Sequence, residues 1–149
     1  MEIKTQAPVK VMYTKVKTTL QDIQQYVGKT PMDIKTECDR LGLTTNKVQH
    51  WVYYGASMEP NKEFTLQICL EVEGEAKSDK YQFQELPEFK CATTIHNGSW
   101  DNFAATYEKF IPTVMSKGHQ LTNISREVYL TVDFENPENN VTEIQIGVA

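Results

Sequence analysis

Residues 48–54 read VQHWVYY, and residues 124–130 read ISREVYL. Each stretch carries a β-branched residue at its first and fifth positions and a tyrosine at its sixth, and the two stretches lie 76 residues apart. Because β-branched and aromatic residues favour strands, we predict two equivalent strands, one in each half of the chain.

The segments around these two strands also repeat in order. Apolar residues alternate with polar ones in 8–17 and 64–72 of the first half, and strand-like runs occupy 89–96 and 141–148 of the second. A helical face spaced by three and four residues begins near Thr30, and another follows Ser99. Each half is therefore predicted to be strand, helix, strand, strand.

Further residues recur at nearly constant offsets. Gly42 matches Gly118 at the same 76-residue shift, and Lys10 matches Lys90 at a slightly larger one. We predict one domain, 1–149, made of two repeats at about 8–73 and 81–149. The fold class is α+β: duplicated βαββ units with pseudo-two-fold symmetry form an antiparallel sheet. Two helices cover one face, and a ligand cleft lies on the other.

The composition argues against some classes of function. The 149 residues include 20 acidic and 15 basic ones, for a net charge of −5, and no lysine or arginine cluster suits a phosphate backbone. We expect no direct nucleic-acid binding. No signal peptide or membrane-spanning run is present, and three widely spaced cysteines suit reduced thiols, so we expect a cytoplasmic protein without membrane contact.

The odd-numbered residues of the two matching strands are the candidate site. If Val52 and Val128 pack under the helices, pleat alternation turns Trp51, Tyr53, Glu127 and Tyr129 toward the opposite face. The repeat superposes Trp51 on Glu127, so an aromatic ring is expected opposite a carboxylate. Such a site suits an apolar or cationic small molecule, because aromatic faces attract cations and a poorly solvated carboxylate serves as counter-ion or proton-transfer base. A solvated Glu127 and merely sheet-covering aromatics remain the alternative.

The sequence gives weaker support for metal binding or nucleophilic catalysis. The three histidines show no metal-ligand spacing, and no serine or cysteine has a nucleophile-elbow context, so we expect neither metal nor cofactor. His96 is interpreted as a structural residue at the helix entrance, and Glu143 as a surface or ion-paired residue.

Short elements of the second half resemble a known family. They are His96-Asn97-Gly98, Glu127-Val128-Tyr129 and Thr142-Glu143-Ile144. In order and spacing they resemble the GyrI-like small-molecule-binding domain, also described as the effector-binding domain of AraC-type and multidrug-sensing activators. Gly147 stands where the family usually has proline. No helix-turn-helix precedes the domain, which suggests a stand-alone bacterial member.

The resemblance implies that Glu127 meets lipophilic and often cationic ligands among aromatic residues. The leading hypothesis is a binding protein that senses or sequesters such a ligand, with no enzyme activity. A hydrolase of strained, cyclopropane-type toxic compounds, in which catalytic Glu127 directs a water, is the alternative. Gyrase inhibition through a protein interaction is a third, and no protein partner is identifiable.

Overall fold

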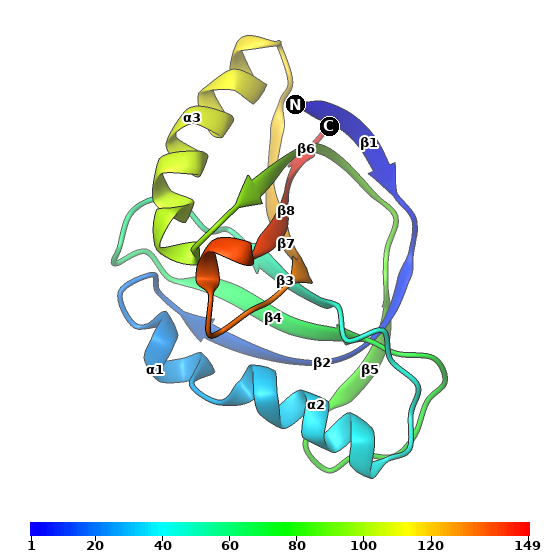
Figure 1. The fold of residues 1–149 in the computed structure, drawn as a ribbon. Helices are drawn as coiled ribbons and strands as arrows, with labels where there is room; N and C mark the ends of the chain where they lie inside the picture. The colour runs from blue at the N-terminus through cyan, green and yellow to red at the C-terminus, as the bar shows by residue number, and fades with distance from the viewer.

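Eight antiparallel strands form one curled sheet that carries all the helices (Figure 1). The computed structural model describes all residues from Met1 to Ala149. The elements are β1 (Glu2–Gln6), β2 (Val9–Thr18), α1 (Ile23–Val27), α2 (Thr30–Arg40), β3 (Gln49–Tyr54), β4 (Phe64–Glu71), β5 (Gln82–Leu86), β6 (Phe89–Asn97), η1 (Trp100–Asn102), α3 (Phe103–Ser116), β7 (Leu121–Thr131), η2 (Pro137–Asn139) and β8 (Val141–Val148). The α+β class and the antiparallel sheet are as predicted.

The strand order is symmetric about the centre of the sheet. It runs β1-β6-β8-β7-β3-β4-β2-β5, so the two strands that the sequence paired by their letters, β3 and β7, are neighbours. Trp51 is paired with Ile68 in the first half, and Glu127 with Ile144 in the second, and both pairs differ by the same 76 positions. The two halves thus share a pairing register, while a duplication in the origin of the chain stays a prediction.

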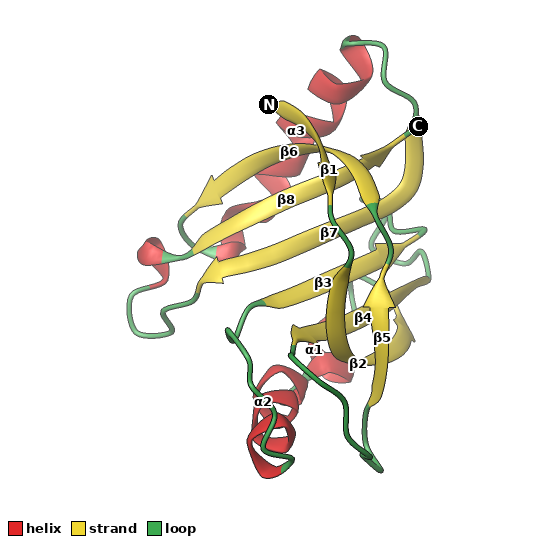
Figure 2. Cartoon of the chain, turned by 90° about the vertical axis from the view of Figure 1, so that its right-hand side faces the viewer, coloured by secondary structure: helices red, strands yellow, loops and turns green.

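Two edge strands were not predicted from the sequence. β1 pairs with β6, and β5 pairs with β2. Short connections that contain Pro8 and Pro87 join β1 to β2 and β5 to β6 (Figure 2). The segments are short and polar, EIKTQ and QFQEL. Edge strands of this kind carry little apolar alternation, because only a few of their side chains are covered.

The helices pack as their sequence periodicity predicts. Ile34 and Cys38 of α2 are fully buried against Met12 and Leu70, and Phe110 of α3 is buried in a second cluster. The Ser99 side chain accepts a hydrogen bond from the Asp101 amide, as expected of a residue that caps a helix entrance. The helices lie on one face of the sheet, with α1 and α2 over one half and α3 over the other (Figure 1).

The opposite face of the sheet is covered where β3 crosses it. The sheet curls on itself, and Val52 is completely buried there with Val11, Cys69 and Leu86. The even-numbered residues of β3 therefore point away from the helices, and the odd-numbered ones point toward them. The prediction that the cleft lies opposite the helices was wrong. Apolar alternation could not decide the matter because both faces of β3 are covered.

Gly147, the position at which the sequence departs from the family pattern, is required by close packing. A Cβ atom there would collide with Thr122 Oγ1 and lie 2.8 Å from the Ile124 carbonyl oxygen. The pairing of β7 with β8 is irregular at this point, and Asn123 adopts a positive φ of 64°. Glycine lets β8 pass this irregularity without a steric clash.

None of the helices is both long enough and apolar enough to cross a membrane.

Candidate ligand-binding site

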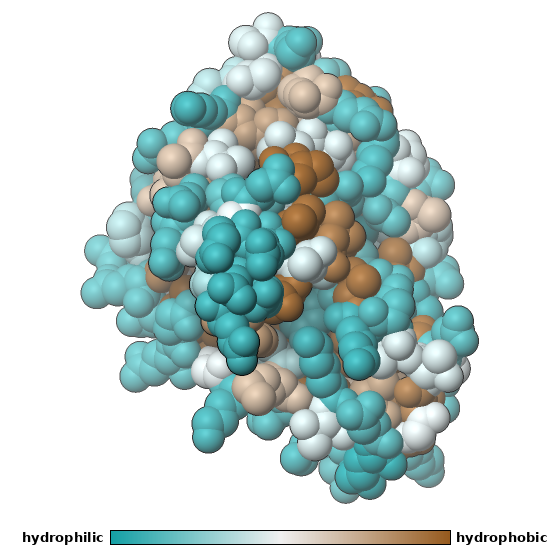
Figure 3. All heavy atoms as spheres, in the orientation of Figure 1, coloured by the Kyte–Doolittle hydropathy of each residue, from teal (hydrophilic) through white to brown (hydrophobic).

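A cavity of about 620 Å³ lies between the helices on the helix-covered face of the sheet. β3 and β7 form its floor, α1 and α2 form one wall, and α3 forms the other. Of its 30 lining residues 19 are hydrophobic, which suits an apolar molecule of drug-like size. From the side seen in Figure 3, hydrophobic side chains are visible in a central band surrounded by polar ones.

Glu127 is the only carboxylate on the cavity floor. It lies in β7 directly opposite Trp51 of β3, and only 5% of the residue is exposed. Three tyrosine hydroxyls donate to it: Tyr53 and Tyr129 to Oε1 at 2.8 and 2.7 Å, and Tyr107 to Oε2 at 2.6 Å. A carboxylate has about four acceptor positions, so roughly one remains for another donor.

The carboxylate has no cationic partner within the protein. The ion pairs of the molecule are Lys4 with Glu143, Lys10 with Glu75, Arg40 with Glu37 and His50 with Glu71. Burial raises the pKa of Glu127 above its ordinary value, while the phenol hydrogen bonds and the nearby His96 act in the opposite direction. The site thus contains a desolvated acid that three phenols hydrogen-bond and that has no ion-pair partner for its charged form.

The walls beside Glu127 are aromatic rings in edge-to-face contact. Tyr129 meets Trp51 with ring centroids 5.5 Å apart and Trp100 at 5.4 Å. Trp100 in turn meets Phe134, which is 73% exposed. Rings arranged in this way present both faces and edges to the cavity, and the faces attract positive charge.

Gln49 holds one of these rings in place. Its buried side chain accepts a hydrogen bond from Trp51 Nε1 at 3.2 Å and donates to the Pro31 carbonyl oxygen at 2.9 Å. The amide therefore connects the first turn of α2 to the indole that faces Glu127.

The structure brings together all four residues selected from the sequence, namely Trp51, Tyr53, Glu127 and Tyr129. Sequence reasoning missed Tyr107, which donates to Glu127 from α3. A phenol within an otherwise apolar helix face was the available signal. Trp100 and the α1 and α2 wall were also missed, because the predicted cleft was on the wrong side of the sheet.

Two other predictions are confirmed. His96 is buried at the entrance to α3, with Nδ1 2.7 Å from Thr106 Oγ1 and Nε2 2.9 Å from the Ser99 carbonyl oxygen. Glu143 lies in β8 at 2.7 Å from Lys4.

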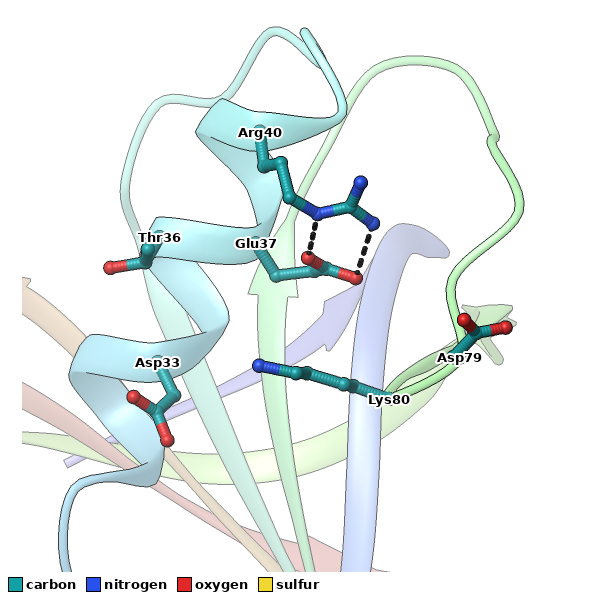
Figure 4. Close-up of a pocket in the computed structure, with 6 residues that line it drawn as sticks. All are labelled: Asp33, Thr36, Glu37, Arg40, Asp79 and Lys80. Carbon is teal, nitrogen blue, oxygen red and sulfur yellow. Dashed lines mark hydrogen bonds and ion pairs between the residues drawn. The ribbon is translucent and has the colours of Figure 1, made fainter.

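A second, wholly polar cavity of about 380 Å³ lies beside α2 (Figure 4). Glu37 accepts two hydrogen bonds from Arg40, at 2.6 and 3.1 Å, and one from Ser78 at 2.6 Å. Ser78 also accepts hydrogen bonds from the amides of Lys80 and Tyr81. The cluster fastens the segment before β5 to α2.

The fold and the buried acid define a class of protein: an α+β domain built around a lined cavity for a small molecule. The chain belongs to the GyrI-like small molecule binding domain family, whose model matches residues 1–149. No functionally curated protein matches the chain.

Solved structures share the fold at low sequence identity. EcmrR in its DNA complex is 22% identical with a TM-score of 0.81; the alignment covers 99% of this chain and 56% of that one. The protein SAV2435, bound to tetraphenylphosphonium, is 15% identical with a TM-score of 0.70, over 99% of this chain and 93% of that one. A hydrolase from Listeria innocua is 10% identical with a TM-score of 0.57, over 99% and 92%.

Proposed function

We propose that this protein binds a lipophilic aromatic cation in the cavity between its helices, with Glu127 as the counter-ion, and thereby senses or sequesters that compound. One observation carries the proposal: a buried carboxylate lies in an aromatic cavity and has no cation of its own. A ligand cation would supply the missing charge, and ring faces would replace its hydration shell.

A binding experiment with two ligands of the same shape and opposite charge separates the effect of charge from the effect of shape. Tetraphenylphosphonium and tetraphenylborate have nearly the same shape and opposite charge. The phosphonium ligand at about 100 times its dissociation constant is expected to add about 2.7 kcal/mol of stability, whereas the borate is expected to add little. Thermal unfolding with each compound measures this, and equal stabilisation by both would overturn the counter-ion role.

The likeness to a hydrolase gives a second candidate function. As a cyclopropane hydrolase, the protein would use the free acceptor position of Glu127 to orient a water and to take its proton as the water oxygen bonds to a strained ring carbon. The ring C–C bond breaks in the same step, its electron pair passes to a conjugated carbonyl of the substrate, and the resulting oxyanion takes up a proton from solvent. Such an enzyme predicts that Glu127→Gln abolishes turnover of a cyclopropane-bearing electrophile and leaves its affinity within a few-fold. Product analysis by mass spectrometry decides between the two, since a binding protein leaves the compound intact.

A further inference from the structure

The cavity carries positive charge at one end, apart from its buried acid. Its charged lining residues are Glu127, Asp101, Lys35 and Lys47. Both lysines lie on the side of α2 and β3. Asp101 is exposed and belongs to the opposite wall, at the start of the segment that leads into α3.

The two lysines lie toward the same end of the cavity. The hydrogen bond from Gln49 to the Pro31 carbonyl oxygen joins the start of β3 to the start of α2. Lys35 is about one helical turn beyond Pro31, and Lys47 is two residues before Gln49. Because the chain reverses between α2 and β3, both positions lie beyond this link in the same direction (Figure 1).

Neither lysine has a partner in the protein, since the ion pairs involve Lys4, Lys10, Arg40 and His50. The backbone of Lys47 is also held in a fixed turn. It has a φ of 69°, its amide donates to Thr45 Oγ1 at 2.9 Å, and that hydroxyl donates to the Glu71 carbonyl oxygen of β4. The turn therefore fixes the backbone from which the unpaired Lys47 side chain extends.

The distance from Glu127 to the lysines sets the length of a ligand that could contact both. Lys47 is four residues before Trp51, which lies opposite Glu127, so the Cα atoms of Lys47 and Trp51 are at most about 14 Å apart, the reach of four extended residues. A lysine side chain shortens that span by several ångströms when it turns back over the cavity.

Building on the proposed function, we propose that the cavity is a two-ended site for a dipolar ligand. The aromatic cation of the ligand lies against Glu127, and a carboxylate on a flexible chain reaches Lys35 and Lys47. The lysines then act as specificity determinants that favour cations with an anionic tail over plain cations of the same size. An exposed ion pair contributes modestly, so the preference is expected to be about three- to ten-fold.

Matched phosphonium compounds test this. Pentyltriphenylphosphonium and (4-carboxybutyl)triphenylphosphonium have the same chain length and differ in the terminal carboxylate, and a carboxydecyl compound tests reach. Calorimetric titration should show tighter binding of at least one carboxylated compound at low salt. The advantage should shrink between about 0.05 and 0.5 M salt, because mobile ions screen charges at the rim.

The variant Lys35→Gln/Lys47→Gln should lose the preference for carboxylated compounds. Its affinity for the pentyl compound should not fall, because the two removed charges repel a plain cation. The matched control Lys109→Gln/Lys117→Gln removes the same charge from exposed positions of the α3 region outside the cavity and should keep the preference. If the pentyl compound binds and the carboxylates bring no advantage, or the advantage survives in the cavity variant, the two-ended site is refuted. If no phosphonium compound binds, the counter-ion proposal fails, and this inference fails with it.

Discussion

Two carboxylates in this protein are almost equally hidden from solvent and have opposite surroundings. Only 5% of the Glu37 side chain and 5% of Glu127 is exposed. Glu37 is held by the Arg40 guanidinium and by Ser78, and those contacts lower its pKa to about 2 (Figure 4). Glu127 is held by three phenols and no cation, and burial raises its pKa.

The presence or absence of a cationic partner distinguishes a structural acid from a candidate binding acid. An acid that already has its cation contributes to the fold, as Glu37 does by fastening the segment before β5 to α2. An acid that has only neutral donors has no counter-charge within the protein, and a bound cation can supply one.

The largest expected effect concerns ligand affinity. Glu127→Gln should weaken binding of tetraphenylphosphonium by about 2 kcal/mol, or roughly 30-fold, because the desolvated counter-charge is lost. The matched variant Glu37→Gln should leave the dissociation constant unchanged. Isothermal titration of both variants measures this, and similar affinity losses in the two would remove the functional distinction.

The melting temperatures of the two variants should change in opposite directions. Glu37→Gln should lower the melting temperature at neutral pH, because the Arg40 pair is lost. Glu127→Gln should raise it, by about 2–4 °C for each kcal/mol of desolvation cost removed. The glutamine carbonyl oxygen still accepts hydrogen bonds from two of the phenols, and its NH2 group donates to the Tyr107 hydroxyl. Calorimetry without ligand provides the comparison, and a lower melting temperature of the Glu127 variant would contradict it.

The pH dependence follows from the directions of the two pKa shifts. Glu37 stabilises the fold above its ordinary pKa of 4.5, and this contribution is lost as the pH falls toward about 2. Protonation of Glu127 favours the fold, and that contribution is lost as the pH rises through its raised pKa.

Affinity for a lipophilic cation should therefore fall when the pH is lowered through the raised pKa of Glu127, while the Glu37 ion pair is still intact. Titrations at successive pH values locate the midpoint. A midpoint below the ordinary value of 4.5 would contradict the raised pKa.

The smallest expected effect concerns the phenol on α3. Tyr107→Phe removes one hydrogen bond from the charged form of Glu127, which costs about 1–2 kcal/mol and raises the pKa of Glu127 further. The midpoint of cation binding should move to higher pH. The matched change Ser78→Ala raises the pKa of Glu37 and should leave that midpoint where it is.

Periodicity and repetition along the chain predicted the inner strands, the two longer helices and the register of the central strands, but not the edge strands β1 and β5. The alternation in β2 and β4 and the helical spacing of Ile34 and Cys38 each predicted an element that the structure contains. The 76-residue offset predicted Trp51 opposite Glu127, and the structure has that pair. These features were readable because they depend on period and spacing along the chain.

Tertiary structure alone decided which face of the sheet holds the cavity, and which distant residues complete it. Strand alternation groups Trp51 with Tyr53 and Glu127 with Tyr129, but it assigns neither group to a side when both faces are buried. The curl of the sheet buries Val52 and leaves the odd-numbered residues beneath the helices, where Tyr107 reaches Glu127. Such contacts arise between segments far apart in the chain, so the local sequence pattern does not reveal them.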